Sequence, residues 1–266
     1  MSFAFIQITD HHLRETEQTL TFGFSPAWAL RSVLRDVAES CAERADFIIS
    51  TGDLVHMGTE AEYLCLCRLL NLEDLSPAPG PQRISVEGLE GFPIYFLPGN
   101  HDSRELFYRS LFPQSQPSDT MNLSFIHKGV QFICLDWGTE DKGVIQPEML
   151  EFVGRELQTD LPSILLMHHN PVPVGCRWVD EWVPEDVDRF WKVLEGQNVL
   201  GILHGHTHGT FETWVGGIPV LGLRSTSWTF DFAVLDEIVR CLRPPHYRLV
   251  MVQDGKLSTE IHEVNL

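Results

Sequence analysis

Six short apolar, β-rich runs that each end in a polar residue or cluster are the feature that most limits how this chain can fold. These runs are residues 3–9, 47–51, 93–98, 130–135, 164–167 and 199–203. Short runs of this kind are typical of strands buried in the interior of a protein. Ligands of open α/β sheets bind beyond the carboxyl ends of the strands, so we expect the polar clusters to meet at one edge.

Helices are predicted between these strands. Their starts are marked by Ser25-Pro26, by a capping box of Thr59 and Glu62, and by Pro147, and the acidic stretch 181–194 is predicted as a further helix. The Pro- and Gly-rich span 75–93 is predicted as a loop or small insertion.

The C-terminal part changes character. Residues 211–220 and 247–264 each read as an antiparallel hairpin, with turns at Gly216-Gly217 and Asp254-Gly255. Early β-α alternation followed by late hairpins predicts an α/β fold with α+β character. We expect a four-layer αββα sandwich of two mixed β-sheets flanked by helices. Residues 1–266 are expected to form a single domain, with about 211–266 as an integral extension.

Composition limits the partners. The 266 residues carry a net charge of -18, which argues against duplex nucleic acid as a tightly held ligand but leaves small anionic substrates open. No stretch of 18 apolar residues occurs, so no membrane span is expected. The N-terminal residues show no basic leader, and the 6 cysteines include no Cys-x-x-Cys pair. Both observations favour a cytoplasmic protein with reduced thiols. Exposed aromatic residues and the last hairpin allow a homo-oligomer without requiring one.

Five polar clusters share one chemical character. They are Asp10-His11-His12, Gly52-Asp53, Gly99-Asn100-His101-Asp102, His168-His169 and Gly205-His206-Thr207-His208. Carboxylate, imidazole and amide ligands together suit Mn, Fe or Zn. Two such ions a few Å apart activate a bridging hydroxide and clamp a phosphoryl group. A structural zinc site does not fit, because such sites prefer a closed, cysteine-rich set of four ligands.

The order of these five clusters resembles the calcineurin-like metallophosphoesterase superfamily. Further segments are similar to its class III cyclic nucleotide phosphodiesterase and glycerophosphodiesterase branch, so the resemblance covers nearly the whole chain. They are residues 52–58 with Glu62-Tyr63, Leu135-Asp136, residues 168–175, 214–219 and 244–249. Asn170 departs from the second proline often found after the histidine pair in this branch, which leaves fine substrate specificity open.

The resemblance implies two metal ions. The first would be held by Asp10, His12, Asp53 and His208, and the second by Asp53, Asn100, His168 and His206, with Asp53 bridging. It also implies that His101 donates a hydrogen bond or proton to the phosphate or the leaving oxygen. A purely structural hydrogen bond is the alternative for His101, and Asp102 could orient the His101 ring.

Other residues near the clusters carry weaker expectations. His11 and His204 are expected to be structural, because neighbouring side chains at a strand end point to opposite faces. His169 is expected to pack or hydrogen-bond beside the ligands. His56 could line the pocket or face solvent, and Arg224 could hold a phosphate oxygen or form a salt bridge. The tryptophans at 178, 182, 191, 214 and 228 could stack on a nucleobase, although core packing is preferred.

The function expected from these features is binuclear metal-dependent hydrolysis of small phosphodiesters, of the cyclic nucleotide or glycerophosphodiester type. Metal-bridged hydroxide would attack phosphorus in line. A phosphomonoesterase using the same residues is the nearest alternative, and a polynucleotide nuclease is disfavoured by the net charge. A non-catalytic protein-interaction scaffold is the alternative from another class, since a fold alone does not prove activity.

Overall fold

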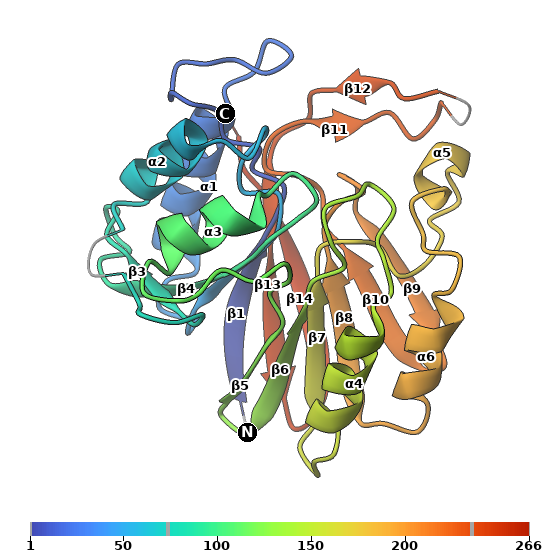
Figure 1. Cartoon of the computed structure of the whole chain (residues 1–266). Coiled ribbons are helices and arrows are strands. Elements are labelled where there is room, and N and C mark those ends of the chain that lie inside the picture. Colours follow the sequence, from blue (N-terminus) through green and yellow to red (C-terminus); the bar gives the residue numbers. More distant parts are fainter. Residues whose placement is uncertain (1, 73–74, 235–236, 266) are drawn as a thin grey trace.

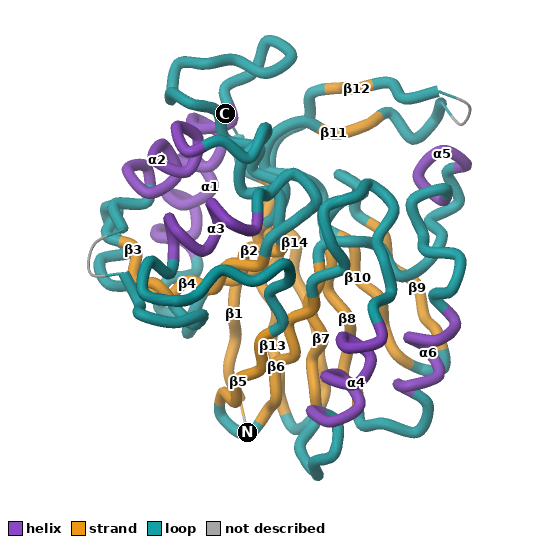
Figure 2. Tube along the Cα trace, in the orientation of Figure 1, coloured by secondary structure: helices purple, strands orange, loops and turns teal. Residues whose placement is uncertain are grey.

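The structure is a computed structural model, and it describes residues 2–72, 75–234 and 237–265. Two six-stranded sheets form its centre, and helices cover their outer faces (Figures 1 and 2). The first sheet has the order β14 (Lys256–Glu263), β13 (His246–Gln253), β1 (Ser2–Ile8), β2 (Ile48–Thr51), β4 (Phe92–Leu97) and β3 (Gln82–Ile84). The second has the order β5 (Leu123–His127), β6 (Val130–Leu135), β7 (Ser163–Met167), β8 (Val199–His204), β10 (Ile218–Gly222) and β9 (Phe211–Val215).

Both sheets are mixed, as predicted. β1, β2 and β4 run parallel to one another, and so do β6, β7, β8 and β10. The two predicted C-terminal hairpins are present, and each joins a different sheet: β9–β10 extends the second, and β13–β14 pairs antiparallel with β1 in the first. A further short pair, β11 (Thr229–Phe230) and β12 (Arg240–Cys241), stands apart from both sheets (Figure 1).

Helices lie outside the sheets and complete four layers. They are α1 (Pro26–Ser40), α2 (Glu60–Leu69), α3 (Arg104–Leu111), α4 (Pro147–Glu156), α5 (Arg177–Asp180) and α6 (Asp188–Leu194). The first three pack on the first sheet, while α4 and α6 pack on the second. Between the sheets, Phe5 of β1 and Phe47, which directly precedes β2, pack with Phe132 and Leu166 of the second sheet. Each such side chain, once fully buried, contributes about 1.5–3 kcal/mol. The expected αββα sandwich is confirmed.

Local signals explain most helix starts. Ser25 accepts a hydrogen bond from the main chain of Trp28 at 3.2 Å, and Thr59 forms the expected capping box with Glu62. The prediction of a helix over 181–194 is wrong for its first half, because α6 begins only at Asp188. Pro184 lacks an N–H and restricts the residue before it, which prevents a continuous helix.

Several elements were not predicted, among them α5 and the β11–β12 pair. β3 lies within the span predicted as a loop and pairs antiparallel with β4, and neither α3 nor β5 was anticipated. None of the helices in the described part of the chain is long and apolar enough to cross a membrane.

Candidate metal centre

The predicted site residues meet where the carboxyl ends of strands from both sheets come together, at the upper end of the view in Figure 1. Asp10 and His12 follow β1, Asp53 follows β2, Asn100 and His101 follow β4, His168 follows β7, and His206 and His208 follow β8. Four of the predicted ligands therefore come from the first sheet and three from the second. The predicted site residues therefore lie where ligands of open α/β sheets bind, beyond the carboxyl ends of strands.

The backbone at the site is unusual. Five predicted ligands have left-handed backbone conformations, with φ between 48° and 66°: Asp10, His12, Asp53, His206 and His208. For residues with a side chain this conformation costs about 1–2 kcal/mol each. Residues held in such conformations cluster at functional sites, where the surrounding structure compensates for their cost.

Close packing of glycines fixes the carboxylates. A Cβ atom added at Gly99 would overlap the Oδ1 atom and main-chain nitrogen of Asp53. One added at Gly205 would overlap Thr9 Oγ1 and lie 2.6 Å from Asp10 Oδ2. The loops after β4 and β8 can approach the two aspartates this closely only because these positions lack a side chain.

The first group of candidate ligands is compact. Asp10, His12, Asp53 and His208 are buried, and each offers a ligand atom within 4.8 Å of the others. The Nε2 atoms of His12 and His208 are 2.9 Å apart. His12 Nε2 lies 3.4 Å from Asp53 Oδ2, and His208 Nε2 lies 3.4 Å from Asp10 Oδ1. One ion could be held by all four side chains.

A second group adjoins the first through Asp53. The Nε2 atom of His168 lies 3.3 Å from Asp53 Oδ2, 3.0 Å from Asn100 Oδ1 and 3.3 Å from His206 Nδ1. The same oxygen of Asp53 therefore faces His12 on one side and His168 on the other. This is the arrangement that a carboxylate shared by two ions requires.

The tautomers of these histidines leave lone pairs facing inward. His208 Nδ1, His168 Nδ1 and His206 Nε2 each lie 2.8–2.9 Å from a main-chain carbonyl oxygen. A carbonyl only accepts hydrogen bonds, so these nitrogens carry protons, and in the neutral form of each ring the opposite nitrogen is bare. The amide of Asn100 donates to Asp141 Oδ1 at 3.1 Å, which turns its oxygen inward. Bare nitrogens and oxygens that converge in a buried space fit a bound cation.

Without a metal ion, the pKa values of the candidate ligands are shifted in opposite directions. Burial raises the pKa of Asp10 to about 7 and lowers the pKa of His208 to about 3. Burial alone would raise the pKa of Asp53, but His168, His101 and His12 outweigh it and hold that pKa well below its ordinary value. Burial alone would lower the pKa of His168, but Asp53 and Asp10 outweigh it and raise that pKa to about 9. Metals bind neutral imidazole and ionised carboxylate, so a bound cation would displace the protons of His168 and Asp10.

His101 and Asp102 make contacts with different parts of the surrounding loops. The Nδ1 atom of His101 donates to the carbonyl of His56 at 2.6 Å, which leaves Nε2 available at the pocket. Asp102 accepts hydrogen bonds from the main chain of Leu54 and Gly99 and from the Tyr63 hydroxyl. These contacts do not support Asp102 as the residue that orients the His101 ring. Asp102 instead ties the loop after β4 to the loop after β2 and to α2.

The neighbouring histidines take the structural places expected of them. His11 is buried between the hydroxyls of Thr226 and Ser50, at 2.8 Å from each. His204 is buried with its Nδ1 atom 2.9 Å from the carbonyl of Gly205. His169 lies 2.9 Å from the carbonyl of Glu140.

The two open alternatives for His56 and Arg224 are resolved by their contacts. His56 lines the pocket, and its ring stacks on His101 with centroids 5.3 Å apart. Arg224 forms a salt bridge with Glu263 at 2.6 Å and donates to the carbonyl of Pro244. Its guanidinium is therefore already engaged away from the centre.

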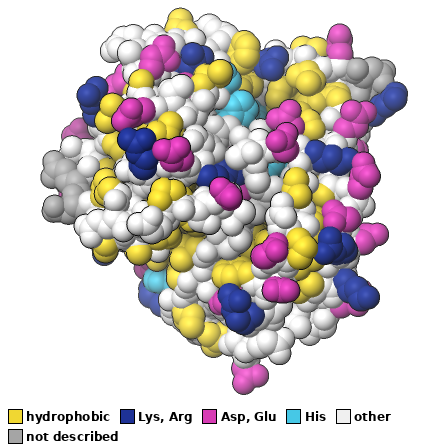
Figure 3. Space-filling model, viewed as in Figure 1, with side chains coloured by type: hydrophobic (Ala, Val, Ile, Leu, Met, Phe, Trp, Pro, Cys, Tyr) yellow, Lys and Arg dark blue, Asp and Glu magenta, His cyan; other side chains and the backbone are white. Residues whose placement is uncertain are grey.

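The cavity over the centre has a volume of about 170 Å³ and includes residues that the sequence motifs missed. The added lining residues are Asp141, Trp182, Trp228, Phe230, Ile238 and Arg240. Trp228 packs on His12 with centroids 4.3 Å apart, and Trp182 packs on His206 at 4.8 Å. In Figure 3, histidine surface opens in a hollow near the top, with hydrophobic side chains beside it. Of the tryptophans considered from sequence, these two lie in the pocket wall, whereas Trp214 is exposed on β9.

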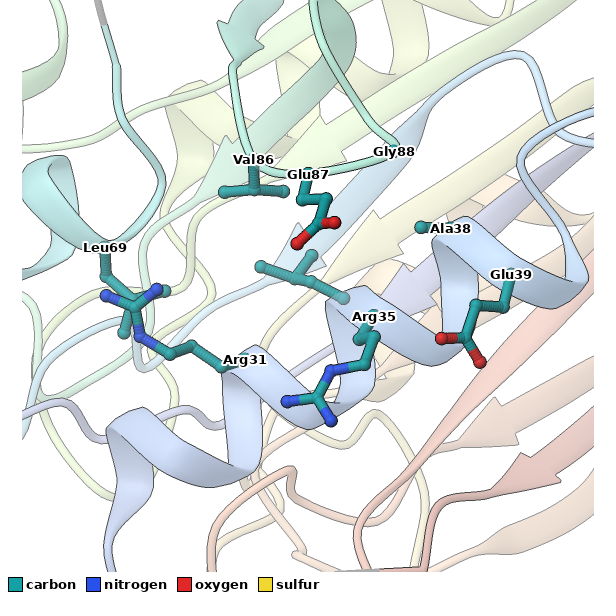
Figure 4. A pocket seen from close by; sticks show the side chains of 9 residues that line it. Arg31, Arg35, Ala38, Glu39, Leu69, Val86, Glu87 and Gly88 are labelled. Carbon is teal, nitrogen blue, oxygen red and sulfur yellow. The ribbon is translucent and has the colours of Figure 1, made fainter.

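A larger cavity, about 390 Å³, lies elsewhere between α1 and residues 86–88 (Figure 4). It contains none of the predicted site residues. Arg31, on its wall, already pairs with Glu17 at 2.6 Å, and Glu39 and Glu87 face the same space. The candidate ligands converge in the smaller cavity and not in this one.

Comparisons with known proteins agree with this geometry. Residues 3–210 match the family model described as calcineurin-like phosphoesterase. A probable cyclic nucleotide phosphodiesterase of Colwellia psychrerythraea is 31% identical, over 97% of this chain and 93% of that protein. The 3',5'-cyclic adenosine monophosphate phosphodiesterase CpdA of Escherichia coli is 28% identical, over 97% of this chain and 89% of its own length. A dimetal phosphatase from Danio rerio has a similar fold, with a TM-score of 0.61, 14% identity and 99% of each chain covered.

Proposed function

The chain belongs to the calcineurin-like phosphoesterase family of metal-dependent hydrolases, and from that premise we propose that it hydrolyses small phosphodiesters at a centre of two metal ions. The observation that carries the proposal is the Oδ2 atom of Asp53, which lies 3.4 Å from His12 Nε2 and 3.3 Å from His168 Nε2. One carboxylate thus faces two groups of ligands.

Seven side chains would hold the ions. The first ion would take Asp10, His12, Asp53 and His208, and the second would take Asp53, Asn100, His168 and His206. This mixture of imidazole, carboxylate and amide ligands suits Mn, Fe or Zn. When bound, two such ions supply Lewis-acid charge to a phosphoryl group and lower the pKa of a water molecule.

The chain's own residues supply binding and proton transfer. His101, fixed through Nδ1 by the carbonyl of His56, would present Nε2 to the phosphate or to the leaving oxygen. Trp182 and Trp228 cover candidate ligands and limit the access of water. We further propose that residues 1–266 act as one domain, because its C-terminal strands belong to both sheets.

Size, charge and relatives favour a small diester as substrate. The cavity of about 170 Å³ lies in a chain with a net charge of -18, which disfavours a long polyanion. Two relatives that match along nearly the whole chain carry the names of cyclic nucleotide phosphodiesterases. A cyclic nucleotide is therefore the first substrate to assay, and a glycerophosphodiester the second.

The test compares an aryl phosphodiester with the matching monoester, using Mn-loaded protein. Asp53→Ala should lower kcat/KM by about 10³-fold or more, because it removes a ligand from both ions. The metal content of Asp53→Ala should also fall. Asp160→Ala, at an exposed position away from the centre, should change neither kcat/KM nor metal content. Preferential cleavage of the monoester would contradict the diester part of the proposal. Failure to cleave either ester with Mn, Fe or Zn bound would overturn it.

A further inference from the structure

Arg240 stands at the wall of the metal cavity and belongs to none of the sequence motifs. It is the only lysine or arginine among the described residues that line this cavity. It lies on β12, and its backbone pairs with Phe230 of β11, which lines the same cavity. The β11–β12 pair rises beside the centre, across from the loop that precedes α1 (Figure 1).

No side chain in the described part of the chain neutralises the positive charge of Arg240. Within residues 2–72, 75–234 and 237–265, its guanidinium has no ion pair and no hydrogen bond. Its Cζ atom lies 4.6 Å from the ring centroid of Phe22 and 6.0 Å from that of Phe230. A cation–π contact positions the guanidinium but leaves its N–H donors free.

Other arginines near the centre are engaged. Arg104 donates to both oxygens of Asp136 and to the carbonyls of Gly99, Asp102 and Gly138. Arg224 is bound to Glu263. Arg240 therefore differs in combining a place on the cavity wall with unused donors.

We infer that Arg240 binds a phosphate oxygen of the substrate and so sets substrate affinity. The inference rests on the proposed phosphoesterase function and names one more residue for it. A phosphate group has more oxygens than two ions occupy, and a guanidinium matches two of them in geometry. In a chain with a net charge of -18, a local cation at the mouth also offsets long-range repulsion of an anionic substrate.

The experiment uses Arg240→Gln and, as a matched control, Arg243→Gln. Arg243 is exposed, lies three residues further along and does not line the cavity, so both variants lose the same charge. Binding of inorganic phosphate to the Mn-loaded protein is measured by calorimetry, and KM and kcat are measured with the aryl diester. Arg240→Gln should weaken phosphate binding and raise KM by about tenfold while kcat changes little. Arg240→Lys should recover part of the affinity, and Arg243→Gln should match the wild type.

The outcomes separate this inference from the proposed function. Equal phosphate affinity and equal KM in the two glutamine variants would overturn the role of Arg240, while turnover by wild type would leave the hydrolase standing. Phosphate binding that depends on Arg240, in a protein without turnover, would support the site and overturn the activity. A wild type that neither binds phosphate nor turns over would overturn both.

Discussion

At the scale of single residues, Arg104 shows how one side chain fixes a loop that carries candidate ligands. It is buried, and two of its nitrogens donate hydrogen bonds to Asp136. It also donates to three main-chain carbonyls of the surrounding loops. A buried ion pair whose hydrogen bonds are all made costs about 3–5 kcal/mol when one partner is removed. The pair therefore holds the main chain at Asn100 and His101 in place, although neither charged group lies in the cavity.

His246 makes stability depend on pH. Burial, together with Arg224 and Arg248, lowers its pKa to about 3, and its Nε2 atom accepts a hydrogen bond from the main chain of Arg224 at 2.9 Å. In the unfolded chain the pKa is about 6.5, so between these values the unfolded state binds more protons. This contribution is complete above about pH 6.5 and is lost as the pH falls toward 3. Between pH 7 and pH 5 it should lower the free energy of unfolding by about 1–2 kcal/mol.

The measurement is urea unfolding of metal-free wild type and His246→Asn at pH 7 and pH 5. Asparagine can accept the same main-chain hydrogen bond but does not titrate. The variant should lose less stability than wild type over this interval. An identical loss in the two proteins would show that His246 is not the group responsible.

At the scale of elements, prediction succeeded where the signal is local. The capping box of Thr59 and Glu62, and the proline starts of α1 and α4, depend only on neighbouring residues. The helix predicted over 181–194 failed because composition was given more weight than Pro184. β3 escaped prediction because three residues carry too little pattern, and only pairing with β4 makes them a strand.

The close packing of Gly205, directly after β8, leads to a testable prediction. A side chain at Gly205 would collide with Thr9 and Asp10, both buried, so Gly205→Ala should displace Asp10. We expect less than half the metal content of wild type and a lower Tm. Gly154→Ala is the control, since in α4 its nearest atom is Val193 Cγ1 at 3.9 Å. Gly154→Ala should keep the metal, and its free energy of unfolding should rise by about 0.5–1 kcal/mol. Full metal content in Gly205→Ala would refute the steric argument.

At the scale of the whole molecule, the sequence predicted the centre of the site better than its walls. The candidate ligands lie in short motifs that follow predicted strands, so their convergence follows from the sheet order. Asp141, Trp182 and Arg240 lie in segments between 138 and 241 that no motif marks. Their places depend on how long loops and the β11–β12 pair fold back over the centre, which local pattern does not encode.

The position of the centre between the sheets predicts that metal removal weakens the whole protein. Asp10, His12, Asp53 and Asn100 follow strands of the first sheet, and the three remaining candidate ligands follow strands of the second. Bound ions would join the sheets and compensate for buried carboxylates and left-handed backbone. A ligand present at a thousandfold excess over its Kd raises the free energy of unfolding by about 4 kcal/mol. Removal of the metal by chelation should therefore lower Tm by about 10 °C. Thermal unfolding with Mn and with EDTA measures this. The Tm of Asp53→Asn should not change on addition of EDTA. If the Tm of the wild type did not change either, the idea that metal ions join the two sheets would be contradicted.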